Sequence, residues 1–340
     1  MNVLITGGAG FIGTHTANFY LKAGNKVTVF DNFSRKGTRE NVKWLEKSEQ
    51  KTENRKQKLH VIEGDIRDFD KLKKSISGND VIIHLAGQVA VTTSVVNPRE
   101  DFEINALGTF NVLESVRLHA PDSILLFAST NKVYGGMEEI KIIKKGKKYI
   151  YRDLPEGISE AQNLDFHSPY GCSKGTADQY VRDYHRIYGL KTVVFRQSCI
   201  YGTHQFGIED QGWVSWFTIA SVLEKPITVY GDGMQVRDVL FVEDLVKAYD
   251  LTIKKIGETA GKIYNVGGGP TFTLSLLELL MLLEKKLGKK IPYTSADWRP
   301  GDQPVYVSNI SKINKELVWK PEIDVQEGTS RMINWIVKEK

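Results

Sequence analysis

The sequence predicts an α/β fold in which helices cover both faces of a parallel sheet and a smaller α/β lobe is interleaved with it. Three observations predict this fold. Short apolar runs alternate with stretches of helical periodicity, a glycine-rich turn joins the first run to the first such stretch, and the last third of the chain changes pattern. A chain of 340 residues with 41% hydrophobic content can bury a large core.

The chain begins with a strand, a helix and a second strand. The apolar residues 3–5 precede a glycine turn, residues 14–23 have helical periodicity, and the apolar run 26–30 ends at Asp31. Further strands are predicted at 59–63, 81–85, 123–128 and 192–196, and helices at 104–117, 175–188, 274–287 and 325–337. Because ligands of such sheets bind at the carboxyl ends of the strands, we expect functional residues there.

The glycine turn TGGAGFIG predicts a dinucleotide site of the Rossmann type. Gly7, Gly10 and Gly13 have the spacing G-x-x-G-x-x-G, which permits a tight turn, close approach of backbone N–H groups to a pyrophosphate, and close packing of helix on sheet. Asp31 follows about 20 residues later, at the end of the next strand. Its carboxylate can accept hydrogen bonds from a ribose diol and would repel a 2′-phosphate, which favours NAD, although Arg35 and Lys36 could embrace that phosphate.

The motif SPYGCSKG indicates the chemistry, because it places Tyr170 and Lys174 four residues apart on one helix face, with Ser168 as the expected N-cap. A phenol with a pKa of about 10 is a poor base at neutral pH, and lowering that pKa by about 3 units requires about 4 kcal/mol. A lysine ammonium one turn away and a positive nicotinamide ring can supply this stabilisation. Ser129 and Thr130, at the end of the fifth strand, can bond the same substrate oxygen, and we select Thr130.

Seven motifs occur in one order along the chain: the glycine turn, GDIRD, HLAG, STNKVYG, YGCSK, VRDVLFVEDL and YNVGGG. In content and order they resemble the extended short-chain dehydrogenase/reductases over essentially the full length. The resemblance implies that Tyr170 and Lys174 carry proton transfer, that Thr130 orients the hydroxyl, and that NAD takes the hydride. It also implies a nucleotide diphosphate sugar as substrate, held by the smaller lobe.

The positions after Thr130 bear on which reaction is carried out. The 4,6-dehydratases of this superfamily have an acid pair there, whereas this chain has Asn131 and Lys132, which disfavours elimination of water. Longer stretches such as DNFSRKGTRENVKWL and HLAGQVAVTTS resemble nucleotide-sugar 2-epimerases, which implies transient oxidation at carbon 2, rotation of the 2-keto sugar and re-reduction. A 4-epimerase or reductase on another nucleotide sugar, and a regulatory protein that only binds NAD, stay open as alternatives.

These motifs define the candidate site residues. The cofactor-binding residues are expected to be Gly7, Gly10, Phe11, Ile12, Gly13, Asp31, Asn32, Ser34, Arg35, Asp65, Ile66, Leu85, Ala86, Gly87, Tyr170 and Lys174. The substrate-binding residues are expected to be Gln88, Thr93, Asn131, His167, Gln211, Trp213, Arg237 and Arg299, with the two arginines as clamps for the diphosphate. His84 lies inside an apolar run and is interpreted as a core residue.

The predicted domains are a Rossmann domain of residues 1–196 and 232–262 and a nucleotide-sugar lobe of residues 197–231 and 263–340. The lysine-rich stretches 51–58 and 141–148 are interpreted as solvated loops, and a net charge of +5 without a recognised motif does not indicate nucleic-acid binding. Two cysteines without paired spacing suggest neither a disulfide framework nor a metal site. No apolar stretch is long enough to span a membrane, so we expect a cytoplasmic enzyme, and the resemblance implies a homodimer.

Overall fold

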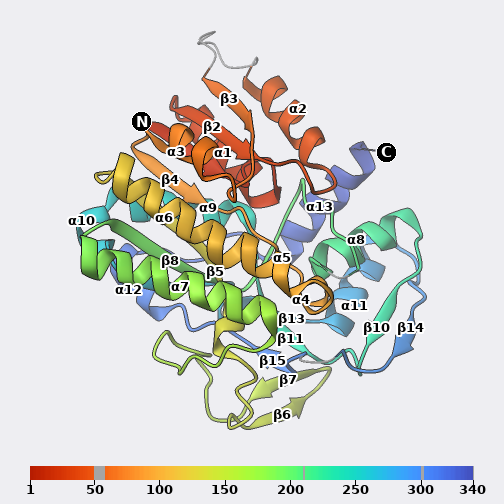
Figure 1. Ribbon diagram of the computed structural model, residues 1–340. Coiled ribbons are helices and arrows are strands. Elements are labelled where there is room, and N and C mark those ends of the chain that lie inside the picture. The colour runs from red at the N-terminus through yellow and green to blue at the C-terminus, as the bar shows by residue number, and fades with distance from the viewer. Residues whose placement is uncertain (50–57, 210, 300–301, 340) are drawn as a thin grey trace. The chain divides into compact units, whose positions relative to one another are not determined.

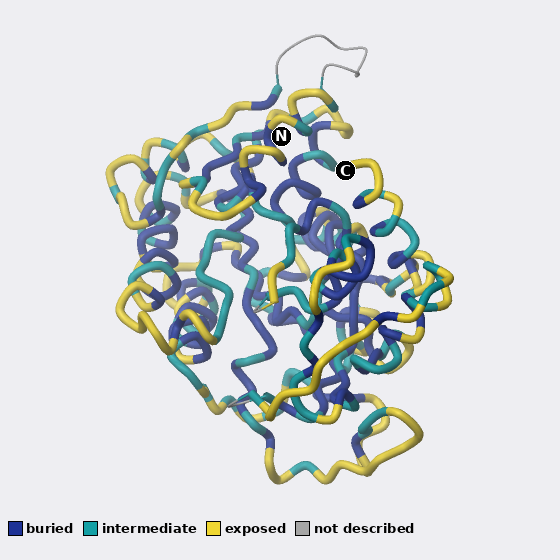
Figure 2. Tube along the Cα trace, turned by 90° about the vertical axis from the view of Figure 1, so that its right-hand side faces the viewer, coloured by how far each residue is buried: buried dark blue, intermediate teal, exposed yellow. Residues whose placement is uncertain are grey.

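The computed structural model describes residues 1–49, 58–209, 211–299 and 302–339, and the chain divides into two compact units. The first unit comprises Met1–Val133, Ser168–Arg196 and Val246–Tyr264, and the second unit comprises Tyr134–His167, Gln197–Leu245 and Asn265–Lys340. Buried and exposed segments alternate along the trace of both units (Figure 2).

The first unit contains the predicted parallel sheet (Figure 1). Among the described residues, seven strands pair in the order β12-β8-β5-β4-β1-β2-β3. These strands are β1 (Asn2–Thr6), β2 (Lys26–Asp31), β3 (Leu59–Glu63), β4 (Val81–His84), β5 (Ile124–Thr130), β8 (Lys191–Gln197) and β12 (Ile263–Val266). Because β1 pairs in parallel with β2 on one side and β4 on the other, the strand order reverses beside β1, where such sheets bind ligands.

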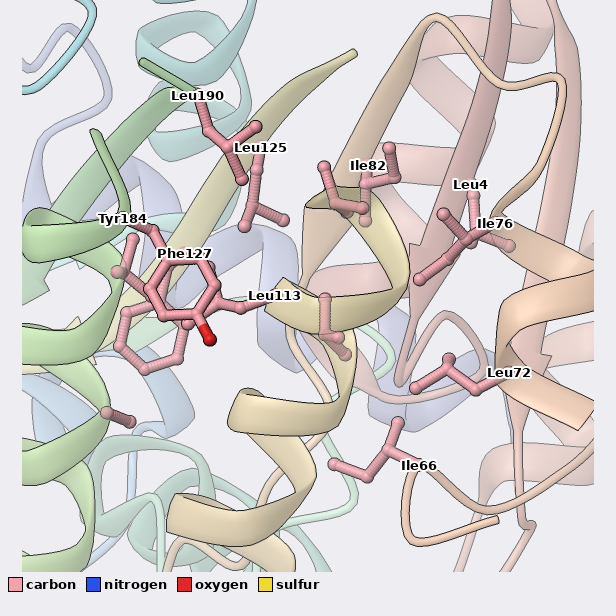
Figure 3. Packing of buried hydrophobic residues seen from close by; sticks show 14 of the residues in the cluster. Leu4, Ile66, Leu72, Ile76, Ile82, Leu113, Leu125, Phe127, Tyr184 and Leu190 are labelled. Atoms are coloured by element: carbon pink, nitrogen blue, oxygen red, sulfur yellow. The ribbon is translucent and has the colours of Figure 1, made fainter. Parts of the chain in front are cut away.

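Helices connect these strands. They are α1 (Phe11–Lys22), α2 (Thr38–Glu49), α3 (Phe69–Ile76), α4 (Val91–Val96), α5 (Pro98–Phe102), α6 (Gly108–His119), α7 (Ser168–Tyr188), α9 (Val242–Lys254) and α10 (Ile256–Thr259), with a π-helix η1 (Glu103–Leu107) and a 3₁₀ turn η2 (Asn131–Tyr134). Leu113 of α6 and Leu72 of α3 pack against Ile82 and Phe127 of the sheet in one apolar cluster (Figure 3). This core fixes the strand ends that carry the candidate site.

Helix α7 contains the predicted helical stretch 175–188 and extends back to the expected N-cap. It starts at Ser168, whose Oγ accepts a hydrogen bond from the Gly171 backbone N–H at 3.2 Å, as expected of an N-cap. Tyr170 and Lys174 therefore lie in its first two turns. The predicted helix 104–117 differs, because its first part is the π-helix η1 and the regular helix α6 begins only at Gly108.

The second unit is built on smaller sheets. Its strands are β6 (Ile142–Lys145), β7 (Lys148–Tyr151), β9 (Cys199–Tyr201), β10 (Thr228–Tyr230), β11 (Val236–Phe241), β13 (Thr273–Ser275), β14 (Thr294–Ala296) and β15 (Val305–Tyr306). Its helices are α8 (Trp213–Leu223), α11 (Leu276–Leu287), α12 (Ser311–Leu317) and α13 (Val325–Lys338), with a 3₁₀ turn η3 (Pro270–Phe272).

The two compact units divide the chain differently from the predicted domains. Residues 134–167 and 232–245, predicted for the Rossmann domain, lie in the second unit, and residues 263–264, predicted for the lobe, lie in the first. The reason is strand pairing, since β11 pairs with β9, β13 and β15 of that unit. The hairpin β6-β7 joins the same group, because the Tyr149 backbone N–H donates to the Met234 carbonyl at 3.0 Å.

The lysine-rich stretch 141–148 was expected to be a loop but forms most of this antiparallel hairpin, whose strand β6 is exposed. The other stretch, 51–58, lies outside the described residues apart from Lys58. Within the described ranges, no helix has both the length and the apolarity to cross a membrane, and no group of three potential ligands could hold a metal ion.

Candidate active site

The glycine turn closes tightly between β1 and α1. Gly7 has a φ of +68°, and a Cβ there would lie 2.6 Å from the Ala86 backbone nitrogen. A Cβ on Gly13 would lie 2.4 Å from the Gly7 carbonyl oxygen. The turn and the loop after β4 are therefore packed backbone against backbone, so that Gly7 adjoins the candidate residues Leu85, Ala86 and Gly87.

The N-terminus of α1 is free to receive an anion. Its N-cap, Gly10, has no side chain to occupy the first N–H groups, and the first turn, which includes Phe11 and Ile12, contains no acidic residue. Helix N-termini of this kind bind phosphate through backbone N–H groups and the helix dipole. The residues present thus fit the pyrophosphate of a dinucleotide.

Asp31 lies at the end of β2 and is 9% exposed. Its carboxylate accepts backbone hydrogen bonds from Phe33 at 2.9 Å and Ala9 at 3.1 Å, which fixes it beside the glycine turn. Burial raises the pKa of Asp31, while these two bonds and the charge of Arg35 act in the opposite direction. A carboxylate held in this position suits a ribose diol.

The remaining cofactor candidates lie beside the ends of β2 and β3. Asp65 accepts hydrogen bonds from Arg67 at 2.8 and 2.9 Å and from Asn32 at 3.0 Å, and the Arg67 bond lowers the pKa of Asp65 to about 2. The Ser34 backbone N–H donates to Asn32 at 3.1 Å. Ile66 is buried, and a Cβ on Gly108 would lie 2.5 Å from its terminal methyl group.

His84 is fully buried, as expected of a core residue. Its ring nitrogens contact the hydroxyls of Thr6 at 2.7 Å and Thr109 at 3.0 Å. Burial lowers the pKa of His84 to about 3, so the ring is neutral at physiological pH. The ring therefore ties α6 to β1 and β4.

Tyr170 is 8% exposed and its phenol contacts the Thr130 hydroxyl at the end of β5. Burial raises the pKa of Tyr170 to about 12, the Thr130 bond and the charge of Arg35 lower it, and the charge of Asp101 raises it. The Tyr170 backbone N–H donates to Ser94 at 3.1 Å. Tyr170 and Thr130 are thus brought together as the sequence predicts.

Lys174 lies on the same helix and is 6% exposed. Its Nζ donates to the Ala128 carbonyl at 2.6 Å and lies 4.3 Å from the centre of the Phe127 ring. Burial lowers the pKa of Lys174 to about 8, while the charges of Asp178 and Asp101 act against this change. Lys174 therefore loses its proton closer to neutral pH than an exposed lysine does, and two carboxylates limit this change.

A buried ion pair next to Ser129 and Lys174 was not expected from the sequence. Arg196 of β8 and Asp178 of α7 are 2% and 0% exposed and make two hydrogen bonds, at 2.9 and 3.0 Å. Ser129 donates to the same carboxylate at 2.7 Å. The pair therefore fixes the residue before Thr130 and the helix turn after Lys174. An Asp four residues after Lys174 is the only sequence signal that could have suggested it.

Three of the predicted substrate residues lie in the first unit. The Gln88 side chain donates to the Ala90 carbonyl at 2.7 Å, and its backbone N–H donates to Asn105 at 2.9 Å. Thr93 is exposed on α4, and Asn131 accepts a 3.3 Å hydrogen bond from Thr130. Asn131 is thus in direct contact with the candidate catalytic threonine.

The other five lie in the second unit. Arg237 of β11 donates to Asp302 at 2.6 Å and to the Gln303 carbonyl at 2.7 Å. Arg299 lies 4.0 Å from the centre of the Tyr230 ring and 3.5 Å from the Glu209 carbonyl, close to the loop of Gln211.

Trp213 and His167, which also lie in the second unit, each contact a neighbouring side chain. The indole N–H of Trp213, at the start of α8, donates to the sulfur of Cys199 at 3.4 Å, and Cys199 pairs with Val239 of β11. His167 contacts Asp165 at 2.9 Å. Trp213 thus connects α8 to the strand that carries Arg237.

The parallel sheet, the glycine turn and the Thr130, Tyr170 and Lys174 constellation define a short-chain dehydrogenase/reductase of the extended type. The family model for GDP-mannose 4,6 dehydratase matches residues 4–332. The chain therefore belongs to this family of NAD-dependent epimerases and dehydratases.

The chain is also similar to individual proteins within this family. CDP-paratose 2-epimerase of Salmonella typhi is 44% identical and is aligned over 98% of this chain and 99% of its own length. UDP-glucuronate 4-epimerase of Thermodesulfobacterium geofontis is 31% identical, over 98% of this chain and 95% of that protein. The structure of UDP-glucuronic acid 4-epimerase from Bacillus cereus, in complex with UDP-glucuronic acid and NAD, superposes with a TM-score of 0.85 at 26% identity, covering all of both chains.

Proposed function

We propose that this protein is a nucleotide-sugar 2-epimerase that interconverts CDP-paratose and CDP-tyvelose. The observation that carries the proposal is the similarity to CDP-paratose 2-epimerase, which extends over the whole chain, together with the Thr130, Tyr170 and Lys174 constellation at one end of the sheet. The stretches that resembled a 2-epimerase in the sequence are consistent with it.

The three residues divide the proton chemistry between them. The Tyr170 phenolate accepts the proton of the sugar hydroxyl at carbon 2 and later returns it, Thr130 donates a hydrogen bond to the same oxygen, and the Lys174 ammonium stabilises the phenolate. Bound NAD supplies hydride acceptance and return. Because the sugar must present its other face before the carbon is reduced again, the keto sugar is expected to rotate within the site.

Dehydration is not supported as the reaction, despite the name of the family model. Elimination of water needs a further acid and base next to the threonine. Here Asn131 follows Thr130 and bonds to it, and the Lys132 backbone N–H donates to the Thr130 hydroxyl at 3.2 Å. Neither position offers a carboxylate.

We propose NAD as the cofactor, bound by the candidate residues of the glycine turn, the β2 end and the loop after β4. Asp31 supports NAD over NADP because two backbone N–H groups hold its carboxylate where a 2′-phosphate would be repelled.

We propose that the second unit binds the nucleotide diphosphate. Arg237 and Arg299 are its candidate phosphate ligands, and bidentate guanidinium groups suit phosphate oxygens. Asp302 already orients the Arg237 guanidinium at 2.6 Å. In the first unit, Gln88, Thr93 and Asn131 are the candidate contacts for the sugar. In the second unit, His167, Gln211 and Trp213 are further candidate substrate contacts.

The test is NMR of CDP-paratose incubated with the purified protein and no added cofactor, with UDP-glucose and GDP-glucose as parallel substrates. We expect inversion at carbon 2 of CDP-paratose, faster than any change in the other two, and no net formation of NADH. Inversion at carbon 4 would assign the protein to the 4-epimerases, and stoichiometric NADH would assign it to the reductases. An unchanged spectrum after addition of NAD would contradict the proposal.

We also propose that the protein is a homodimer formed through α6 and α7, whose packing is seen in Figure 1. Their outer surfaces carry large exposed side chains, among them Phe110 and Tyr180, whose rings lie 5.8 Å apart, and Leu118 and Ile187. Sedimentation should give a dimer, and Ile187→Glu with Phe110→Glu should give a monomer. A native monomer would refute the proposal. The cytoplasmic location stays a prediction.

A further inference from the structure

Helix α5, which packs against α7, carries a buried carboxylate that the proposed reaction does not use. Asp101 of α5 is 1% exposed. It accepts hydrogen bonds from Ser173 Oγ at 2.5 Å and from Asn105 Nδ2 at 3.1 Å. Among the described residues, both side chains that donate to Asp101 are neutral. A buried carboxylate whose direct partners are neutral retains its charge only if a cation lies close by.

The hydrogen bonds of Asp101 connect it to the active site through two residues, Ser173 and Asn105. Ser173 directly precedes Lys174 on α7. Asn105, in the π-helix η1, bonds to the backbone of Gln88 through both atoms of its amide, at 2.9 and 3.1 Å. A Cβ on Gly87 would lie 3.0 Å from Asn105 Oδ1 and 3.9 Å from Lys174 Nζ, so the amide and the ammonium face the same residue.

Lys174 needs such a counter-charge. The other nearby carboxylate, Asp178, is already engaged by two hydrogen bonds from Arg196. Of the titratable groups on α7, Lys174 is the cation whose charge acts on Asp101, and the charge of Asp101 acts on Tyr170. Helix α4 has no titratable side chain, and Glu103 of η1 pairs with the exposed Arg99. The charge that Asp101 faces in the interior is therefore that of Lys174.

We propose that Asp101 is a positioning residue whose negative charge holds the Lys174 side chain as an ammonium ion. Its hydrogen bonds to Ser173 and Asn105 also hold α7 in place against the loop after β4. This role rests on the tyrosine-based reaction under Proposed function, and it does not depend on which carbon of the sugar is inverted. Burial lowers the pKa of Lys174, and the charges of Asp178 and Asp101 act against this change. Burial likewise raises the pKa of Asp101, and the charge of Lys174 acts against that change.

The sign of the effect follows from electrostatics. Loss of a negative charge disfavours the ammonium ion and favours the phenolate, so Asp101→Asn should lower the pKa of both Lys174 and Tyr170. The pH range of turnover should then move to lower pH, with its alkaline limb shifted by about one unit. A purely structural role would reduce turnover equally at every pH.

The experiment is an NMR titration of the Lys174 side chain in the full-length protein with NAD added, using ¹³C-labelled lysine and Lys174→Arg to assign the signal. We expect the pKa of Lys174 to be about one unit lower in Asp101→Asn than in the native protein. The matched control is Asp244→Asn, because Asp244 is also fully buried but accepts backbone N–H bonds from Glu322 and Ile323 of the second unit. This control should leave the pKa of Lys174 unchanged.

Two further measurements keep the proposal testable if Asp101→Asn does not fold. Ser173→Ala keeps the charge of Asp101 and removes one of its hydrogen bonds, so it should leave the pKa of Lys174 close to its value in the native protein. The carboxyl ¹³C shift of Asp101 in the native protein should indicate an ionised group between pH 6 and 9. A protonated Asp101 in this range, or an unchanged Lys174 pKa in Asp101→Asn, would overturn the proposal. Because no substrate is needed, this result is independent of whether CDP-paratose is epimerised.

Discussion

Replacement of Tyr170 by phenylalanine is expected to reduce turnover by at least about 10³-fold. The substitution removes only the phenol oxygen, which contacts Thr130 and is the group proposed to exchange a proton with the sugar hydroxyl. The ring stays, so the packing of α7 should be retained. NAD should still co-purify or bind, because the glycine turn and Asp31 are untouched.

The size of this effect follows from how unfavourable the phenolate is in the isolated site. With a pKa of about 12, Tyr170 must be stabilised as a phenolate by about five units, on the order of 7 kcal/mol, to act as a base at neutral pH. Because the pKa of about 12 already includes the Thr130 bond, the Lys174 ammonium and the positive ring of the oxidised cofactor are the groups available to supply it. Turnover should therefore depend on the phenol of Tyr170, around which these groups are placed.

The measurement is the rate of CDP-paratose conversion by NMR, with bound cofactor followed by absorbance. Tyr180→Phe serves as the control, since Tyr180 lies on the same helix but is 45% exposed. This control should retain nearly the full rate. If Tyr170→Phe turned over as fast as Tyr180→Phe, proton transfer would have to be assigned to another group.

The sequence was sufficient to predict the parts of this molecule that are encoded by local patterns. The parallel sheet follows from apolar runs that alternate with helical periodicity, and the structure confirms it. The family follows from the seven motifs, and the family model over residues 4–332 confirms it. The contact between Tyr170 and Thr130 could be predicted because each lies at the start of a helix or the end of a strand. Such positions are fixed once the sheet topology is known.

Features that depend on contacts distant in sequence could not be predicted. Asp101 and Ser173 are 72 residues apart, and a single sequence does not indicate that they meet. The π-helix that orients Asn105 has no sequence signature. The place of residues 232–245 in the second unit depends on the pairing of β11 with β9, β13 and β15, which is likewise non-local.

The buried pair of Asp178 and Arg196 leads to the second prediction with a large effect. Asp178→Asn should lower the free energy of unfolding by about 3–5 kcal/mol, because it removes the carboxylate that pairs with the buried Arg196 charge. Urea unfolding followed by circular dichroism measures this change. Arg99→Ala is the contrasting variant, since it removes an exposed pair with Glu103 and should cost about 0.5 kcal/mol or less. Equal losses in the two variants would contradict the argument.

A double replacement separates stability from catalysis at this pair. Asp178→Leu with Arg196→Met removes both charges, and apolar residues of similar volume often recover the stability of a buried ion pair. The double variant should therefore unfold at a higher urea concentration than Asp178→Asn. It should nevertheless turn over slowly, because the Asp178 carboxylate also accepts the Ser129 hydrogen bond and acts on the charge of Lys174. A double variant that recovered stability and rate together would indicate that the pair serves folding alone.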